Sequence, residues 1–77
     1  MKKILETIIL NLVDDKDSVE IIETENEKEI LLEVKVSKDD MGKVIGKQGR
    51  VAKAIRTIMK SMANKENLKK VTIEFIG

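Results

Sequence analysis

Four consecutive residues, Gly46-Lys47-Gln48-Gly49, have the types and spacing best suited to binding chemistry. Glycine at both ends permits a positive φ and leaves no side-chain bulk, so a sugar-phosphate backbone could approach the main chain closely. The run directly precedes a predicted helix, whose free N–H groups and positive dipole end attract phosphate. Lys47 and Gln48 add a charge and a donor. The same glycines could instead serve only as a helix C-cap and a tight turn.

Two better-known phosphate-binding motifs are excluded by the glycine spacing. A P-loop needs four residues between its glycines and then Lys-Ser/Thr, whereas three residues separate Gly42 from Gly46 and Gln48 follows Lys47. A dinucleotide-binding turn needs a Gly-x-Gly pair after a strand, whereas two residues separate Gly46 from Gly49 at a predicted helix-helix junction. The loop therefore belongs to neither class.

The composition removes most catalytic chemistry. The chain has no His and no Cys, and so lacks the commonest general base, both usual zinc ligands and every Ser-His or Cys-His nucleophile system. Asp14, Asp15 and Asp17 lack the pattern of a calcium loop and are expected to be a solvated loop. Asp39 and Asp40, the acids nearest the glycine loop, are expected to cap the short helix that follows them. We therefore expect that the protein is not an enzyme and that it binds no metal, cofactor or small-molecule substrate.

Charge is strongly separated along the 77 residues, which are enough for one small domain. The formal net charge is +1, but residues 14–33 hold nine acids and two lysines, a net −7, while residues 41–60 hold six basic residues and no acid. The basic residues of the second segment are Lys43, Lys47, Arg50, Lys53, Arg56 and Lys60. Such a segment favours an anionic ligand such as nucleic acid over a merely solvated helix.

The apolar start of the chain does not resemble a leader or a membrane anchor. Glu6 and Asn11 interrupt the hydrophobic run of residues 4–13, and no small-residue cleavage site follows it. The expected location is cytoplasmic.

Hydrophobic periodicity indicates which elements must position the loop. We expect a helix over 2–13, strands around 19–22 and 30–36, a short helix over 41–45, a longer helix over 49–63 and a strand over 71–75. The connection between the second and third strands is long and helical, which favours a parallel pair. The predicted fold is α+β, with three helices on one face of a three-stranded mixed sheet.

The longer helix is predicted to be amphipathic. Its sheet-facing arc is expected to hold Val51, Ile55, Ile58, Met59 and Met62. The opposite arc holds Arg50, Lys53, Arg56 and Lys60.

The run from Gly42 to Arg56, with its Ile-Gly-Lys-Gln-Gly core, closely resembles the signature of the KH domain, whose Ile-Gly-x-x-Gly loop joins two helices and clamps single-stranded nucleic acid. The element order resembles the type II arrangement. Length and sequence together resemble the small bacterial single-KH-domain RNA-binding proteins of the KhpA (YlqC) type. The resemblance implies one KH domain over 1–77, with an N-terminal helix and strand in 1–24 and the KH core in 29–77.

The resemblance also implies three sets of RNA-binding residues. The loop would contact the backbone of about four nucleotides through Gly46, Lys47, Gln48 and Gly49. An apolar groove would hold the bases between Val44, Ile45 and Val51 on one side and Val34 or Val36 of the second strand on the other. Further phosphate contacts would come from Lys43, Arg50 and Lys53. Each aliphatic residue named could equally be plain core.

A single-stranded RNA-binding module, acting as an RNA chaperone or post-transcriptional regulator, is the function these features favour. Phe75 is the only aromatic residue, so a surface of stacking aromatic rings is excluded. The family resemblance implies a homodimer, or a heterodimer with a larger Jag-type KH protein.

Two alternatives remain open from the sequence. The first is a protein-interaction adaptor, with Leu10, Ile22, Leu31 and Ile76 on faces expected to be solvated. The second is a duplex-DNA-binding helix-turn-helix with residues 49–63 as the recognition helix, although its partner helix would be short.

Overall fold

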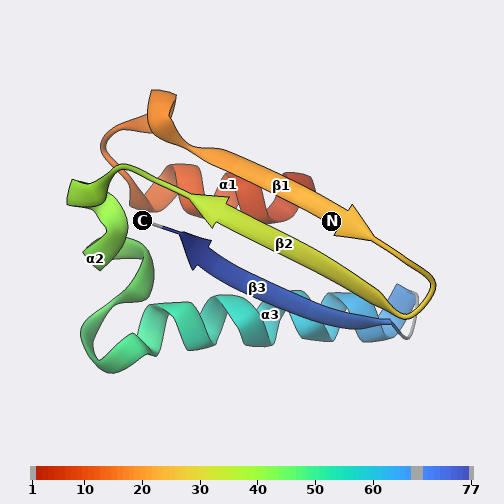
Figure 1. Ribbon diagram of the computed structural model, residues 1–77. Helices are drawn as coiled ribbons and strands as arrows, with labels where there is room; N and C mark the ends of the chain where they lie inside the picture. The colour runs from red at the N-terminus through yellow and green to blue at the C-terminus, as the bar shows by residue number, and fades with distance from the viewer. Residues whose placement is uncertain (1, 67–68, 77) are drawn as a thin grey trace.

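Three helices and three strands follow one another in the order α-β-β-α-α-β in the part of the chain that the structure, a computed structural model, describes, residues 2–66 and 69–76 (Figure 1). The elements are α1 Lys2–Leu12, β1 Glu20–Glu25, β2 Glu29–Lys35, α2 Met41–Ile45, α3 Arg50–Glu66 and β3 Lys70–Ile76. The predicted order of elements is therefore confirmed. Helix α3 continues past its predicted end at residue 63.

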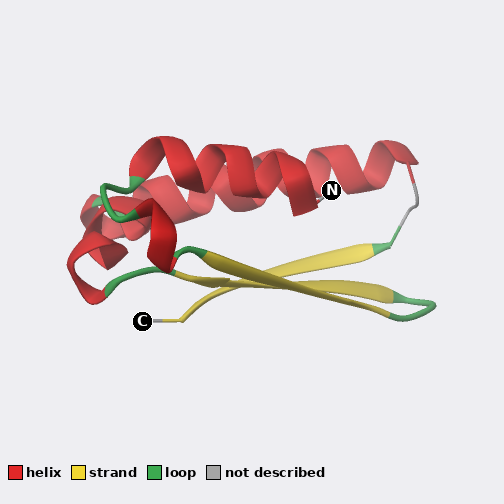
Figure 2. Cartoon of the chain, turned by 90° about the horizontal axis from the view of Figure 1, so that it is seen from above, coloured by secondary structure: helices red, strands yellow, loops and turns green. Residues whose placement is uncertain are grey.

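The three strands form one sheet in the order β1-β2-β3. β1 and β2 are antiparallel, whereas β2 and β3 are parallel because the chain between them crosses over through α2 and α3. Figure 2 shows the helices on one side of the sheet and, among the residues that the structure describes, no helix on the other side. The predicted mixed sheet with all helices on one face is confirmed.

The core lies between the helices and the inward-facing side chains of the sheet. Neighbouring strands align their buried residues, with Val34 opposite Ile21 and Leu32 opposite Ile73. From α1, Leu5 and Ile9 are buried against them. Buried residues alternate with more accessible, mostly half-buried residues along β2, which is the period of two that a sheet covered on one face requires.

Helix α3 is rotated relative to the predicted packing. Ile55 and Met59 are buried as expected, but Ile58 is 47% exposed. Two alanines, Ala52 and Ala63, are buried on the same face instead. Because the prediction weighted only large apolar residues, it missed these small side chains, which let the helix approach its neighbours closely. The predicted core position of Ile58 is wrong.

Candidate nucleic-acid interface

The glycine loop is a tight turn between α2 and α3 in which three residues have a positive φ. Gly46 (φ 77°) is the C-cap of α2, and its N–H donates to the carbonyl oxygen of Gly42 at 2.8 Å. A single 3-10 turn then follows, with φ of 56° at Gln48 and 72° at Gly49. The N–H of Gly49 donates back to the carbonyl oxygen of Gly46 at 3.2 Å. Gly46 is thus a C-cap and Gly49 a turn residue, a geometry that both interpretations of the glycine spacing require.

This turn leaves the polar side chains of the loop in solvent. Lys47 and Gln48 are exposed, as is Arg50, the first residue of α3. The guanidinium of Arg50 lies 3.5 Å from Oε1 of Gln48. Helix α3 has no acid in its first turn, so nothing there offsets its positive dipole end. The loop and the start of α3 form a positively charged surface to which Lys53, also exposed, contributes.

The apolar residues predicted to line a groove are only partly at the surface. Ile45 and Val51 are half-buried and pack against the edge of the core. Val44 is 0% exposed, and Val34 and Val36 are also buried in the core. The predicted groove positions of these three valines are corrected, because their side chains face the inside of the helix-sheet layer. Ile45 and Val51 remain available to a ligand beside the loop.

Arg56 lies at the junction of α3 and the edge of the sheet. Its Nε donates to the carbonyl oxygen of Ile73 at 3.3 Å, and its guanidinium carbon lies 5.3 Å from the centre of the Phe75 ring. This is cation–π distance. The sequence placed Arg56 on the basic arc of the helix but did not single it out as a site residue. Its contact with β3 depends on tertiary packing, so no local sequence pattern predicts it.

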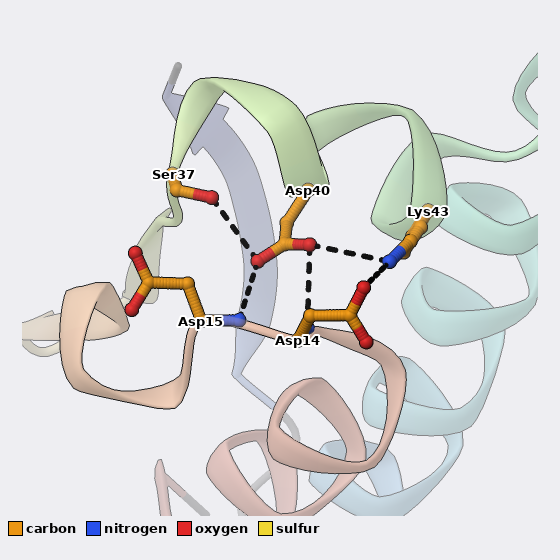
Figure 3. Close-up of polar contacts among 5 residues, drawn as sticks. All are labelled: Asp14, Asp15, Ser37, Asp40 and Lys43. Carbon is orange, nitrogen blue, oxygen red and sulfur yellow. Dashed lines mark hydrogen bonds and ion pairs between the residues drawn. The ribbon is translucent and has the colours of Figure 1, made fainter.

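Asp40 connects the segment before α2 to the segment after α1 (Figure 3). It is 2% exposed, and its carboxylate accepts hydrogen bonds from the backbone N–H groups of Asp14 at 3.2 Å and Asp15 at 2.9 Å. The hydroxyl of Ser37 also donates to it, at 3.1 Å. The hydrogen bond from Asp15 is the largest cause that lowers the pKa of Asp40. Asp40 thereby fixes α2 against the end of α1.

The predicted capping role of Asp40 is wrong. The side chains of Ser37 and Asp40 make no capping hydrogen bond to the turn and helix that they precede. Capping residues and buried carboxylates share the same preference for backbone N–H groups, and here the N–H groups come from a distant loop.

Lys43 lies near the loop in sequence, but its side chain contacts acidic residues. Its ammonium group pairs with the carboxylate of Asp14 and lies 3.5 Å from Oδ1 of Asp40 (Figure 3). The hydrogen bond to Asp14 is the main cause that raises the pKa of Lys43. The structure therefore gives Lys43 two anionic partners before any ligand binds.

Nowhere in residues 2–66 and 69–76 do three or more Asp, Glu, His or Cys side chains gather in a way that could hold a metal ion. None of the helices in these ranges is long and apolar enough to cross a membrane.

Comparison with known proteins identifies the family. The model of the KhpA/KhpB KH domain matches residues 2–75. The RNA-binding protein KhpA of Clostridium acetobutylicum is 58% identical over 76 residues, which cover 99% of this chain and 100% of that protein. The RNA-binding protein KhpA of Aquifex aeolicus is 43% identical, with coverage of 99% and 95%. No solved structure gives a significant match. With a full-length family match and relatives of this similarity, the chain belongs to the KhpA/KhpB family of KH domains.

Proposed function

We propose that this chain, as a single domain over residues 1–77, binds single-stranded RNA without catalysing a reaction. The observation that supports this most strongly is the loop, which exposes Lys47 and Gln48 between two glycines of positive φ, directly before the acid-free first turn of α3. Relatives that match over the whole chain are named RNA-binding proteins. The proposed action is in the bacterial cytoplasm, as an RNA chaperone or post-transcriptional regulator.

In the proposed complex the loop holds the sugar-phosphate backbone of about four nucleotides. Gly46 and Gly49 have no side chain to keep the phosphates away from the main chain. Lys47, Arg50 and Lys53 surround that position with positive charge, and Gln48 adds a donor. These contacts involve the backbone alone and so give affinity with little sequence preference.

The bases in this proposal lie against aliphatic rather than aromatic side chains. Ile45 and Val51 are half-buried beside the loop and present part of their surface to a ligand. Single strands expose base faces that can contact such a surface, whereas a duplex hides them in its stack. Single-stranded RNA is therefore favoured over the duplex-DNA alternative.

Pairing with a second KH chain is a further candidate role, supported by apolar residues on uncovered surfaces. Ile22 is 46% exposed and Ile76 is 38% exposed, and the strand register places both on the sheet face opposite the buried side chains. The proposed partner is a second copy or a larger Jag-type KH protein. Association would also stabilise a domain with so small a core.

An NMR titration of the backbone amides tests the proposed function. A single-stranded RNA oligonucleotide should shift the amides of residues 45–53, and a duplex DNA of matching sequence should shift them much less. Shifts confined to the uncovered sheet face, or equal responses to both nucleic acids, would count against the proposed interface.

A further inference from the structure

We propose that Asp14 weakens nucleic-acid binding by holding Lys43 away from the ligand, so that phosphate must compete with a carboxylate of the protein itself. The proposal rests on the proposed function and adds an internal competitor to it. Lys43 is the basic residue of α2, three positions before Gly46, and it is the basic side chain nearest the loop on that helix. Asp14 is far away in sequence, in the connection after α1.

The two carboxylates around Lys43 are held in very different ways (Figure 3). Asp40 is buried, and two backbone N–H groups and the Ser37 hydroxyl satisfy its oxygens. The side chain of Asp14 is 86% exposed, and among the described residues its carboxylate pairs with Lys43 alone. Asp40 is therefore a fixed part of the fold, whereas the Asp14 carboxylate can be displaced.

Asp40 also explains why Asp14 stays close to Lys43. Its Oδ1 accepts the N–H of Asp14 at 3.2 Å and lies 3.5 Å from Nζ of Lys43. The backbone of Asp14 is thus anchored beside the lysine although its side chain is in solvent. The Lys43 side chain is itself 45% exposed, so a ligand can reach it.

A phosphate that approaches Lys43 meets one positive and two negative charges. The local charge is unfavourable until the Asp14 carboxylate moves away or is removed. Replacing Asp14 by Asn would keep the backbone N–H that Asp40 accepts and would remove one of the two negative charges. Lys43 would then be free to make a phosphate contact.

The experiment measures affinity for a single-stranded RNA oligonucleotide at several salt concentrations. One additional phosphate contact on a single strand changes the log-log salt slope by about −0.7, which corresponds to about fivefold tighter binding at about 0.1 M salt. We expect Asp14→Asn to show both changes. Asp17→Asn is the matched control, since it removes the same charge from an exposed residue of the same connection, three positions further on.

The same measurement in a Lys43→Met background shows whether the gain in RNA affinity requires the lysine. Asp14→Asn should give no gain in that background. Equal affinities of the Asp14→Asn and Asp17→Asn variants, or a gain that persists without Lys43, would overturn the proposal. Failure of the proposed function is distinguishable, because it would appear as equal binding by the wild type and a Lys47→Asp, Gln48→Asp variant. No binding by any variant would overturn both.

Discussion

Gly46 and Val51 approach so closely that a β-carbon on Gly46 would lie 2.4 Å from Cγ2 of Val51. The φ of Gly46 is also +77°, which L-residues with side chains rarely adopt. Gly46→Ala should therefore lower the free energy of unfolding by about 2–4 kcal/mol, from about 1–2 for the backbone and the rest for the clash. Urea denaturation measures the loss.

Two other glycines are the controls for that substitution. Gly49 has a φ of +72° but open space around a β-carbon, so Gly49→Ala should cost only the backbone part, about 1–2 kcal/mol. Gly42 is helical, with nothing within 4 Å, and Gly42→Ala should be neutral or stabilise by up to about 1 kcal/mol. If all three variants lost the same stability, the steric argument for Gly46 would be wrong.

The packing of α3 gives a second prediction. Ile55 is 2% exposed and Ile58 is 47% exposed, although they lie only three positions apart on one helix. Ile55→Ala should lower the free energy of unfolding by about 2–5 kcal/mol through the cavity it leaves. Ile58→Ala should cost less than about 1 kcal/mol. If the two variants lost similar stability in thermal or urea denaturation, the result would support the sequence-based prediction that Ile58 lies in the core.

The fold could be predicted from the sequence because its signals are local. Alternation along residues 30–36 and helical spacing over 2–13 each identify an element without reference to the rest of the chain. The long helical connection then leaves the last two strands parallel. The rotation of α3 was missed because Ala52 and Ala63 contribute little to a hydrophobic pattern but decide how closely a helix packs.

The pH dependence of stability gives a third prediction, through Asp40. Its folded pKa is lowered, chiefly by the hydrogen bond from the Asp15 N–H. A depressed pKa means that the stabilisation is present above the unfolded-state value of about 4 and is lost as the pH falls through the lower folded value. Asp40→Asn should therefore be less stable than the wild type at neutral pH.

The difference between the two proteins is the informative quantity, because other carboxylates titrate in both. Urea denaturation from pH 7 down to about pH 2 should show the wild type losing its advantage over Asp40→Asn at the acidic end. Curves that remain parallel across the whole range would show that Asp40 contributes no pH-dependent stability.

Ionic strength gives a fourth prediction. Lys43 already has two carboxylate partners, so Lys47, Arg50 and Lys53 are the basic residues counted for phosphate contacts. Three contacts on a single strand correspond to a log-log slope of affinity against salt of about −2. A titration series in potassium chloride measures it. A slope near zero would remove the electrostatic part of the proposed interface.

The candidate site was less predictable than the fold, since it depends on contacts between distant segments. The glycine spacing identified the loop, and the structure gives it the expected turn geometry. No sequence pattern indicated that Asp14 would pair with Lys43, 29 positions away, or that Arg56 would reach the carbonyl oxygen of Ile73. The orientation of the five-residue helix α2 decides whether Val44 or Ile45 faces the core. Asp40, which precedes that helix, sets this orientation through its hydrogen bonds to the segment after α1.

The central claim is that the loop from Gly46 to Gly49 holds the RNA backbone, and the Lys47→Asp, Gln48→Asp variant tests it. Both side chains are exposed and lie just before α3, where acids are tolerated, so the fold should be retained. Each new carboxylate at roughly 4 Å from a phosphate opposes binding by about 4 kcal/mol at an effective dielectric constant of about 20, before screening. The same disruption is not expected from Lys2→Asp with Lys3→Asp, at the start of α1, which lies well away from the loop between α2 and α3 (Figure 1).

The decisive measurement is the affinity of this loop variant for single-stranded RNA, alongside its circular dichroism spectrum and melting temperature. We predict at least a tenfold loss of affinity, in line with the charge estimate after screening, with an unchanged spectrum and a melting temperature within a few degrees of the wild type. The Lys2→Asp, Lys3→Asp control should lose much less affinity. Full affinity in a folded loop variant would contradict the account and leave the loop as a turn between two helices.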